Sequence, residues 1–298
     1  MKYIIILLLV FILLPSCGKD TKSKANKVNK LEIIAVKADK PQAHAGEDII
    51  VKSLVGAPEE YNDEFHTIWL LCSPDDDSGF QSCMGEDGII GLPVIDKDEF
   101  HFTVPSDILS QGLEKKKLYV LFTICESDMQ TCQDAITDKG GDGLKSDIFK
   151  LSYKTVEVIK DEFPITNHNP EIKSIYYNGV ELTSDDITLK ARKSDDADDD
   201  NMDDNVFMAE VTSDSFDEIE LPDGEKDFER ITFAWKSTLG EIKYYYTDQK
   251  HDEKVDDLDE NPFNTALTSE VDNYKIYVIA LDTNGGIDWK ILNVTSEE

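Results

Sequence analysis

The sequence contains few basic residues, few cysteines and no hydrophobic run long enough to cross a membrane as a helix. Lys and Arg together number 30 against 62 Asp and Glu, which gives a formal net charge of −32. Nucleic-acid binding needs a basic patch that neutralises phosphates, so this composition argues against a nucleic-acid partner. The N-terminal apolar run covers residues 3–14, whereas a spanning helix needs about 20 residues.

The sequence also lacks the short motifs of common catalytic sites. It contains no G-x-S-x-G, H-E-x-x-H, G-x-x-x-x-G-K-[ST] or G-x-G-x-x-G pattern. The histidines are scattered singly, at His44, His66, His101, His168 and His251. We therefore predict a protein that is not an enzyme. A hydrolase built on an unrecognised pair of carboxylates is the less favoured alternative, because a pair cannot be chosen among so many acidic residues without geometry.

The N-terminus has the organisation of a signal peptide over residues 1–16. Lys2 precedes the apolar run, and Leu14-Pro15-Ser16-Cys17 ends it. This tetrapeptide resembles the lipobox of bacterial lipoproteins. The resemblance implies that the leader is removed before Cys17, which then carries acyl chains such as palmitate and anchors the protein to a membrane of the cell envelope. Gly18 stands where inner-membrane lipoproteins typically have Asp, which favours the outer membrane. A plain secretory signal or an uncleaved anchor is the alternative.

Charge is distributed unevenly between the N-terminal segment and the rest of the chain. Residues 18–30 contain five Lys and one Asp, while residues 31–298 contain 24 basic and 61 acidic side chains, a net charge of −37. We expect residues 17–30 to form a flexible tether with a reach of roughly 20 Å, its lysines near anionic headgroups. The acidic body would be repelled from the same surface, although acidity can also serve solubility alone.

The cysteines other than Cys17 predict disulfides. They are even in number, as expected for an exported protein: Cys72, Cys83, Cys125 and Cys132. Four cysteines allow three connectivities. A zinc site is the less favoured reading, because no two of them have the short spacing of zinc ligands.

Strand periodicity favours two local pairings. Cys72 is out of phase with Trp69, which we expect in the core, so Cys72 faces its own following loop and Cys83. Cys125 is likewise out of phase with its apolar neighbours, and Cys132 follows seven residues later. We predict Cys72–Cys83 and Cys125–Cys132, with Cys72–Cys125 as the rival pairing between neighbouring strands.

The first half of the chain predicts short strands separated by turns, with no long amphipathic helix. Period-two alternation and β-branched or aromatic residues mark strands at 31–38, 49–55, 66–72, 99–105 and 117–125, and a strand pair within 147–159. Residues 39–48 are predicted to form a turn, and residues 73–98 a long polar insertion. Residues 160–170 contain two Pro and two Asn without periodicity, which is typical of a linker.

The second half repeats this plan. A hairpin is predicted over 172–182, because Asn178-Gly179 at its centre is the strongest short hairpin signal. Further strands are predicted at 187–194, 206–211, 230–242, 274–282 and 287–294, and a loop at 251–260. Many short strands bury one face each only by stacking two sheets. We therefore predict an all-β protein with two consecutive Ig-like β-sandwich domains, at 31–159 and 171–298.

Three segments of the second half carry a family resemblance. ITLKARKSDDADDD, ITFAWKSTLGE and YKIYVIALDTNGGIDW resemble the Ig-like and PKD-like repeats of Gram-negative bacterial lipoproteins, over about residues 170–294. The chain departs from those repeats by a longer insertion before Trp235. The resemblance implies a structural or binding lipoprotein that presents Ig-like modules to a protein or glycan partner. An accessory subunit of an envelope complex is the alternative.

One acidic segment has the composition of a metal site. Residues 195–205 contain seven Asp, and Ca²⁺ takes six to eight hard oxygen ligands. Asp196, Asp198 and Asp200 have the 1, 3, 5 spacing of an EF-hand loop and are our candidate calcium ligands. The pattern fails at Asn201 and Phe207, where Gly and Glu are required, so a solvated acidic loop is the favoured alternative. We predict no other cofactor.

Overall fold

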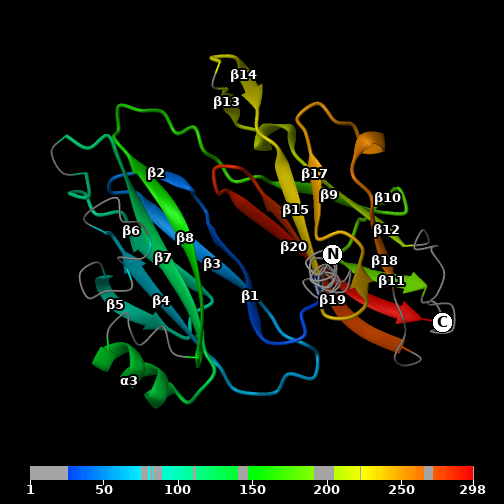
Figure 1. The fold of residues 1–298 in the computed structure, drawn as a ribbon, viewed down its shortest axis with the longest axis horizontal. Helices are drawn as coiled ribbons and strands as arrows, with labels where there is room; N and C mark the ends of the chain where they lie inside the picture. The colour runs from blue at the N-terminus through cyan, green and yellow to red at the C-terminus, as the bar shows by residue number, and fades with distance from the viewer. Residues whose placement is uncertain are drawn as a thin grey trace, which may run out of the picture.

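Strand pairing divides the protein into two consecutive β-sandwiches of Ig-like type. The computed structural model describes residues 26–74, 80, 83, 89–109, 112–139, 147–190, 205–221, 223–264 and 271–297. Within this part of the chain, the named strands before residue 160 pair only with one another, and so do those after residue 171 (Figure 1). No described helix is long and apolar enough to span a membrane.

The first sandwich consists of a three-stranded and a five-stranded sheet. The small sheet has the order β1-β3-β6, formed by β1 (Glu32–Ala38), β3 (Asp48–Gly56) and β6 (Glu99–Thr103). The large sheet has the order β2-β8-β7-β4-β5, formed by β2 (Gln42–His44), β8 (Phe149–Ile159), β7 (Lys115–Cys125), β4 (His66–Cys72) and β5 (Ile89–Ile95). Neighbouring strands are antiparallel except β2 and β8.

An apolar cluster packs on each face of the large sheet. Its inner face places Trp69, Val120 and Phe122 in the core between the two sheets. Its outer face forms a second apolar cluster, which includes both disulfides and is covered by helix α3 (Met129–Lys139). This helix was not predicted. Its sequence is mostly polar, and among its side chains at 129–136 Cys132 and Ile136 are buried, one turn apart on one face.

Three further predictions in the first half are corrected by the structure. β2 lies within the predicted turn 39–48, and β5 lies within the predicted polar insertion 73–98. β5 contains Gly91 and Pro93, which usually interrupt strands, but Pro is tolerated at a sheet edge. The strand pair predicted within 147–159 is instead one strand, Phe149–Ile159, because β8 pairs with β7 along its whole length.

The second sandwich consists of two five-stranded sheets. One has the order β10-β9-β12-β18-β16, formed by β10 (Val180–Glu181), β9 (Ile172–Tyr177), β12 (Val206–Val211), β18 (Asn261–Asn264) and β16 (Glu241–Ile242). The other has the order β11-β20-β19-β15-β17, formed by β11 (Asp186–Lys190), β20 (Ile287–Glu297), β19 (Val271–Leu281), β15 (Ile231–Ser237) and β17 (Tyr246–Gln249). β13 (Glu218–Glu220) and β14 (Lys226–Phe228) form a separate hairpin, at the top of Figure 1.

Local signals placed the centre of this sandwich correctly. Phe233 and Trp235 alternate into the core as predicted, and the Trp235 indole N–H donates to Thr247 Oγ1 at 2.8 Å. The predicted hairpin turn is confirmed, because Asn178 and Gly179 both have positive φ, 50° and 75°. This is the backbone that an Asn-Gly turn adopts most easily.

The two sandwiches pack against each other through sheet faces. Ala35 and Leu54 from the small sheet of the first meet Ala234, Tyr277 and Ile279 on the outer face of β15 and β19. Two ion pairs flank this apolar interface: Lys37 with Asp288 at 2.7 Å, and Lys236 with Glu32 at 2.8 Å.

The last residues of the predicted tether are part of this interface. Val28 is fully buried in it. The Val28 N–H donates to Ser237 O at 2.8 Å, and Asn26 Nδ2 donates to Ile242 O at 2.9 Å. The prediction of a flexible coil is therefore wrong for residues 26–30. Val28 belongs to an apolar cluster that residues of both sandwiches form together. Those residues are distant in the sequence, so no local pattern predicts its burial.

Candidate functional site

The residues singled out from the sequence fall into two groups. Cys17, and the candidate calcium ligands Asp196, Asp198 and Asp200, lie outside the described residues. Within the described residues, no group of three or more His, Cys, Asp or Glu side chains could hold a metal ion.

Both predicted local disulfides are present. Cys72 and Cys83 are joined with an S–S distance of 1.97 Å, and Cys125 and Cys132 with 2.08 Å. Cys72 and Cys125 lie on the outer face of the large sheet, opposite Trp69. The alternation argument therefore identified the correct partners, and the bridges attach the outer covering of the sheet instead of joining strands.

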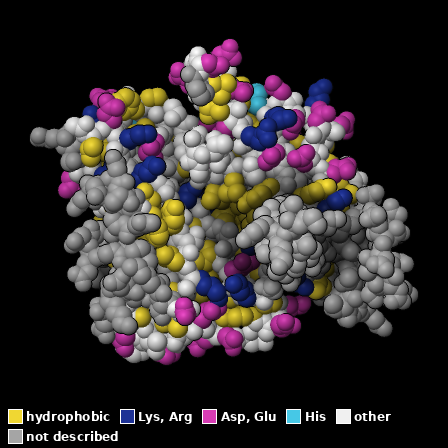
Figure 2. All heavy atoms as spheres, viewed as in Figure 1, with side chains coloured by type: hydrophobic (Ala, Val, Ile, Leu, Met, Phe, Trp, Pro, Cys, Tyr) yellow, Lys and Arg dark blue, Asp and Glu magenta, His cyan; other side chains and the backbone are white. Residues whose placement is uncertain are grey.

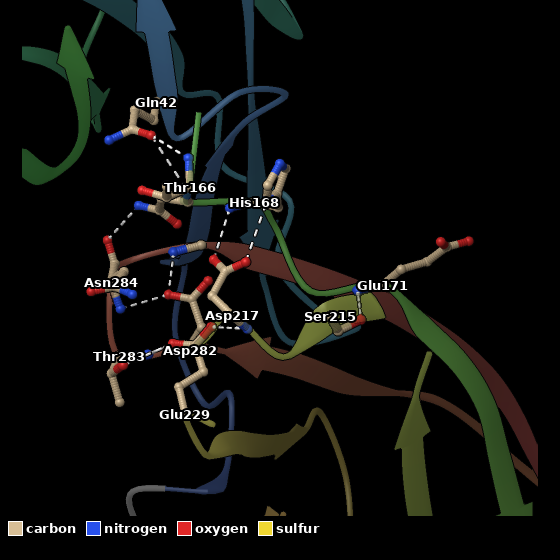
Figure 3. Close-up of polar contacts among 12 residues, drawn as sticks. Gln42, Thr166, His168, Glu171, Ser215, Asp217, Glu229, Asp282, Thr283 and Asn284 are labelled. Carbon is tan, nitrogen blue, oxygen red and sulfur yellow. Dashed lines mark hydrogen bonds and ion pairs between the residues drawn. The ribbon is translucent and has the colours of Figure 1, made fainter. Parts of the chain in front are cut away.

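A network of polar contacts lies where the chain passes from one sandwich to the other (Figure 3). Gln42 of β2 accepts hydrogen bonds on Oε1 from the Thr166 and Asn167 N–H groups, at 2.8 and 3.3 Å. Asn169 Nδ2 donates to Ala38 O at 2.7 Å, and its Oδ1 accepts the Ile287 N–H at 2.9 Å. The connecting segment is thus tied to both sandwiches.

A buried carboxylate organises the second-sandwich side of this junction. Glu229 is 2% exposed. Its Oε1 accepts the Asp217 N–H at 3.1 Å, and its Oε2 accepts the Thr283 N–H at 3.1 Å and the Thr283 hydroxyl at 2.7 Å. Asp217 in turn accepts the His168 N–H at 3.0 Å. Glu229 therefore links the connecting segment to the β19–β20 turn.

Asp282 caps that turn. Its Oδ1 accepts the N–H groups of Asn284 and Gly286 at 2.8 and 2.6 Å, while its Oδ2 is buried without a partner among the described residues. Burial, reinforced by the nearby Glu229 carboxylate, raises the pKa of Asp282 to about 6. The two N–H bonds and Lys154 oppose that rise.

Lys154 crosses from the first sandwich to the same turn. It lies on β8, is 4% exposed, and its ammonium donates to Gly285 O. Burial lowers the pKa of Lys154 to about 8, against the opposing attraction of Asp282. No sequence motif identified this contact, because an isolated Lys in a strand is usually solvated.

A cleft of about 690 Å³ opens beside the junction. One wall is the outer face of β7 and β8, including Lys117, Tyr153 and Glu157. The other wall is the β19–β20 turn together with the connecting segment, including Asn167 and Asn284. Its volume is within the range of about 300–1,000 Å³ typical of ligand sites, which occur preferentially between domains.

A second hollow of about 670 Å³ also lies between the sandwiches, next to β11, β19 and β20. Several of its polar side chains bond to one another. Asn293 Nδ2 donates to Asp186 Oδ1 at 2.9 Å, and the Thr295 hydroxyl donates to Asn273 Oδ1 at 2.9 Å. Glu59, from the first sandwich, and Lys275, from β19, also line it.

Comparisons with known proteins leave the family open. No protein-family model and no curated protein matches the chain. Solved structures that match include the D0-D1 domain of intimin (10% identity, TM-score 0.22, 89% of this chain and 95% of that chain). Escherichia coli alpha-2-macroglobulin matches at 8% identity and TM-score 0.24, over 90% of this chain and 22% of that chain. Three N-terminal domains of the bacteriophage RB49 Hoc protein match at 9% identity and TM-score 0.22, over 89% and 59%. At these TM-scores the similarity carries no functional argument, and the sandwich fold is established by the strand pairing above.

Proposed function

We propose that this chain is a lipid-anchored protein of the cell envelope, of binding or structural type, whose two sandwiches act as one rigid body toward a protein or glycan partner. The observation that carries this proposal is the packed junction. Two domains joined by a linker move relative to each other by default, unless their interface is large and apolar. Here an apolar cluster, two ion pairs and the hydrogen-bonded connecting segment all join the same two bodies.

The lipid anchor is the second part of the proposal and rests on the lipobox resemblance at Cys17. Residues 18–25 separate Cys17 from the docked Asn26. Fully extended, a segment of that length spans at most about 28 Å. The anchored body would therefore remain close to the membrane surface, which suits a protein that presents a fixed surface to a neighbouring envelope component.

Membrane flotation of full-length protein tests the anchor. Wild-type protein should float with membranes, whereas Cys17→Ala should accumulate as unprocessed or soluble product. Ser23→Ala, in the same segment, is the matched control and should float like wild type. If Cys17→Ala had mature size and floated normally, the anchor would be wrong.

Co-purification from detergent-solubilised envelope tests the binding role. Partners captured by wild type should be lost when a charge is placed in the interface between the sandwiches, as in Ile279→Asp, and retained by Val180→Asp on the exposed hairpin. Equal capture by both variants would contradict a rigid two-sandwich binding surface.

A further inference from the structure

The cleft at the junction is a place where this acidic chain concentrates lysines. Three of its lining residues are Lys115, Lys117 and Lys154, against the carboxylates Glu157 and Glu218. The rest of the surface differs, since residues 31–298 carry a net charge of −37. Figure 2 shows Asp and Glu side chains around much of the outline of this face, with Lys and Arg side chains in smaller groups among them.

The ion pairs of the cleft leave one cation uncommitted. Glu157 Oε1 pairs with Lys115 Nζ at 3.0 Å, and its Oε2 accepts a hydrogen bond from Gln42 at 2.9 Å. Glu218 is paired with Lys226 of the neighbouring strand β14. Lys154 bonds to Gly285 O, as described above. Among the described residues, Lys117 has no carboxylate within ion-pair distance, and its side chain is exposed. The cleft therefore contains one ammonium available to a ligand anion.

An exposed aromatic ring lies on the same wall. Tyr153 is 47% exposed. Its ring stacks on Phe80 with centroids 4.3 Å apart and meets Tyr119 edge-on at 5.9 Å. The ring is thus held in one orientation by its neighbours while much of it remains open to solvent. Tyr combines an apolar body with a polar tip, which suits binding at a wet surface.

The spacing of these two groups indicates a ligand with several units. Lys117 lies opposite Glu157 in the β7–β8 register. Tyr153 is four residues before Glu157 on the same face of β8, which corresponds to about 13 Å along the strand. A small anion cannot contact both side chains. Thr155 lies between them and lines the cleft with a hydroxyl.

The facing wall is preformed and polar. Asn167 Nδ2 donates to Asn284 O at 3.1 Å, and the Thr166 N–H donates to Gln42 at 2.8 Å. These bonds fix the orientation of the Asn167 and Gln42 side-chain amides, both of which line the cleft. Sugar hydroxyls both donate and accept hydrogen bonds and match such a lining, and the non-polar C–H face of a sugar ring stacks on an aromatic side chain.

We propose that this cleft binds an oligosaccharide that carries one carboxylate, with a sugar ring on Tyr153 and the carboxylate paired with Lys117. The proposal rests on the binding function proposed above and specifies its ligand class. One uncommitted ammonium matches one acidic sugar. A polyanion such as a nucleic acid would be repelled by the charge of the whole body, and charge-assisted hydrogen bonds explain the preference over neutral sugars.

Calorimetric titration of the full-length, detergent-purified protein tests the proposal. The probes are oligosaccharides of three units that end in neuraminic, glucuronic or galacturonic acid, together with their methyl esters. At least one acid should bind. Its methyl ester should bind at least about tenfold more weakly, as expected for loss of a hydrogen bond to a charged group. Affinity for the acid should also fall with added NaCl.

Variants locate the site. Lys117→Ala and Tyr153→Ala should each weaken binding of the acid at least about tenfold, and only Lys117→Ala should make acid and ester bind alike. Lys243→Ala and Tyr244→Ala remove the same side-chain types from an exposed cation–aromatic pair elsewhere and should bind like wild type. Failure of every acid to bind, equal binding of acid and ester to wild type, or unchanged binding in both cleft variants would overturn the proposal. Flotation and envelope capture test the proposed function separately from this titration. If those two experiments succeed and the titration fails, the acidic oligosaccharide is rejected and the proposed function stands.

Discussion

At the residue scale, Asp282 and Lys154 connect protonation to the junction between the sandwiches. Lys154 is buried and Asp282 is half-buried, so the charged form of each is penalised in the folded protein. They belong to opposite walls of the junction and attract each other, which offsets part of that penalty. The consequence is a stability that depends on pH in two separate ranges.

Asp282→Asn should remove the loss of stability that occurs as pH rises from 3.8 to about 6. The folded-state pKa is about 6, above the ordinary 3.8, so the folded protein binds more protons between those values and wild type loses stability as pH rises through this range. The Asn Oδ1 can still accept the Asn284 and Gly286 N–H bonds. Urea midpoints from pH 4 to 7 should therefore fall less in the variant than in wild type. Asp107→Asn, at an exposed position, is the control, and parallel pH profiles for wild type and Asp282→Asn would contradict the assignment.

Lys154→Met should remove the gain in stability that occurs as pH rises from about 8 to 10.5. The folded-state pKa of about 8 lies below the ordinary 10.5, so the unfolded chain binds more protons between them and wild type should gain stability as pH rises through this range. The full gain is on the order of 3 kcal/mol. Met keeps the apolar stem of Lys but cannot titrate. The free energy of unfolding of the Lys154→Met variant should therefore stay constant over this pH range. Exposed Lys97→Met should retain the wild-type rise, and a rise of the same size in Lys154→Met would show that another group titrates.

At the element scale, helix α3 depends on its attachment. Its sequence contains two Thr, an Ile and two Asp in eleven residues, which are modest helix formers, and isolated helices of this length are marginal in water. It is attached by Cys132 to Cys125 of β7 and by burial of Ile136. The covering of the outer sheet face is therefore held by a covalent bond more than by local propensity.

Replacing Cys125 and Cys132 by Ala should release this helix. We expect a loss of about 2–3 kcal/mol in the free energy of unfolding, from the short loop that the bridge closes, and a weaker helical signal at 222 nm. The matched control is Cys72→Ala with Cys83→Ala, which should cost a similar free energy without reducing the helical signal. An unchanged signal in the first double variant would mean that α3 forms without its bridge.

At the scale of the whole molecule, the two sandwiches and the docked N-terminal segment share one apolar interface. Val28, Ala35 and Ile279 come from three separate parts of the sequence and are all buried there. The core of the second sandwich lies on the opposite face of β19. A change confined to Ile279 therefore tests the association of the sandwiches without emptying either core.

Ile279→Asp should separate the sandwiches. A carboxylate at this buried position has no partner, and burying an unpaired charge costs far more than leaving it in water. Calorimetry should show two unfolding transitions where wild type shows one, and small-angle scattering should give a larger radius of gyration. Val180→Asp, at a position 68% exposed, should behave like wild type. A single transition and unchanged scattering in Ile279→Asp would show that the interface does not couple the two units.

The sequence alone predicted several features that depend on near neighbours. Alternation identified the strands that carry Trp69 and Trp235, Asn178-Gly179 identified a hairpin, and the phase of Cys72 and Cys125 identified both disulfides. Each of these depends on side-chain direction along one strand or on the backbone preference of two residues. Both properties follow from residues that are adjacent in the sequence.

Tertiary structure alone decided the features that need a distant partner. β2 and β5 form because strands β8 and β4 offer free edges, and Val28 is buried because two sheets from different parts of the chain pack together around it. The candidate site is of the same kind. Lys117, Tyr153 and Asn167 have no motif in common, and they line one cleft only because the apolar interface sets β8 of the first sandwich beside the β19–β20 turn of the second. Such contacts depend on the free energy of burying apolar surface over the whole fold, which cannot be estimated from a short stretch of sequence.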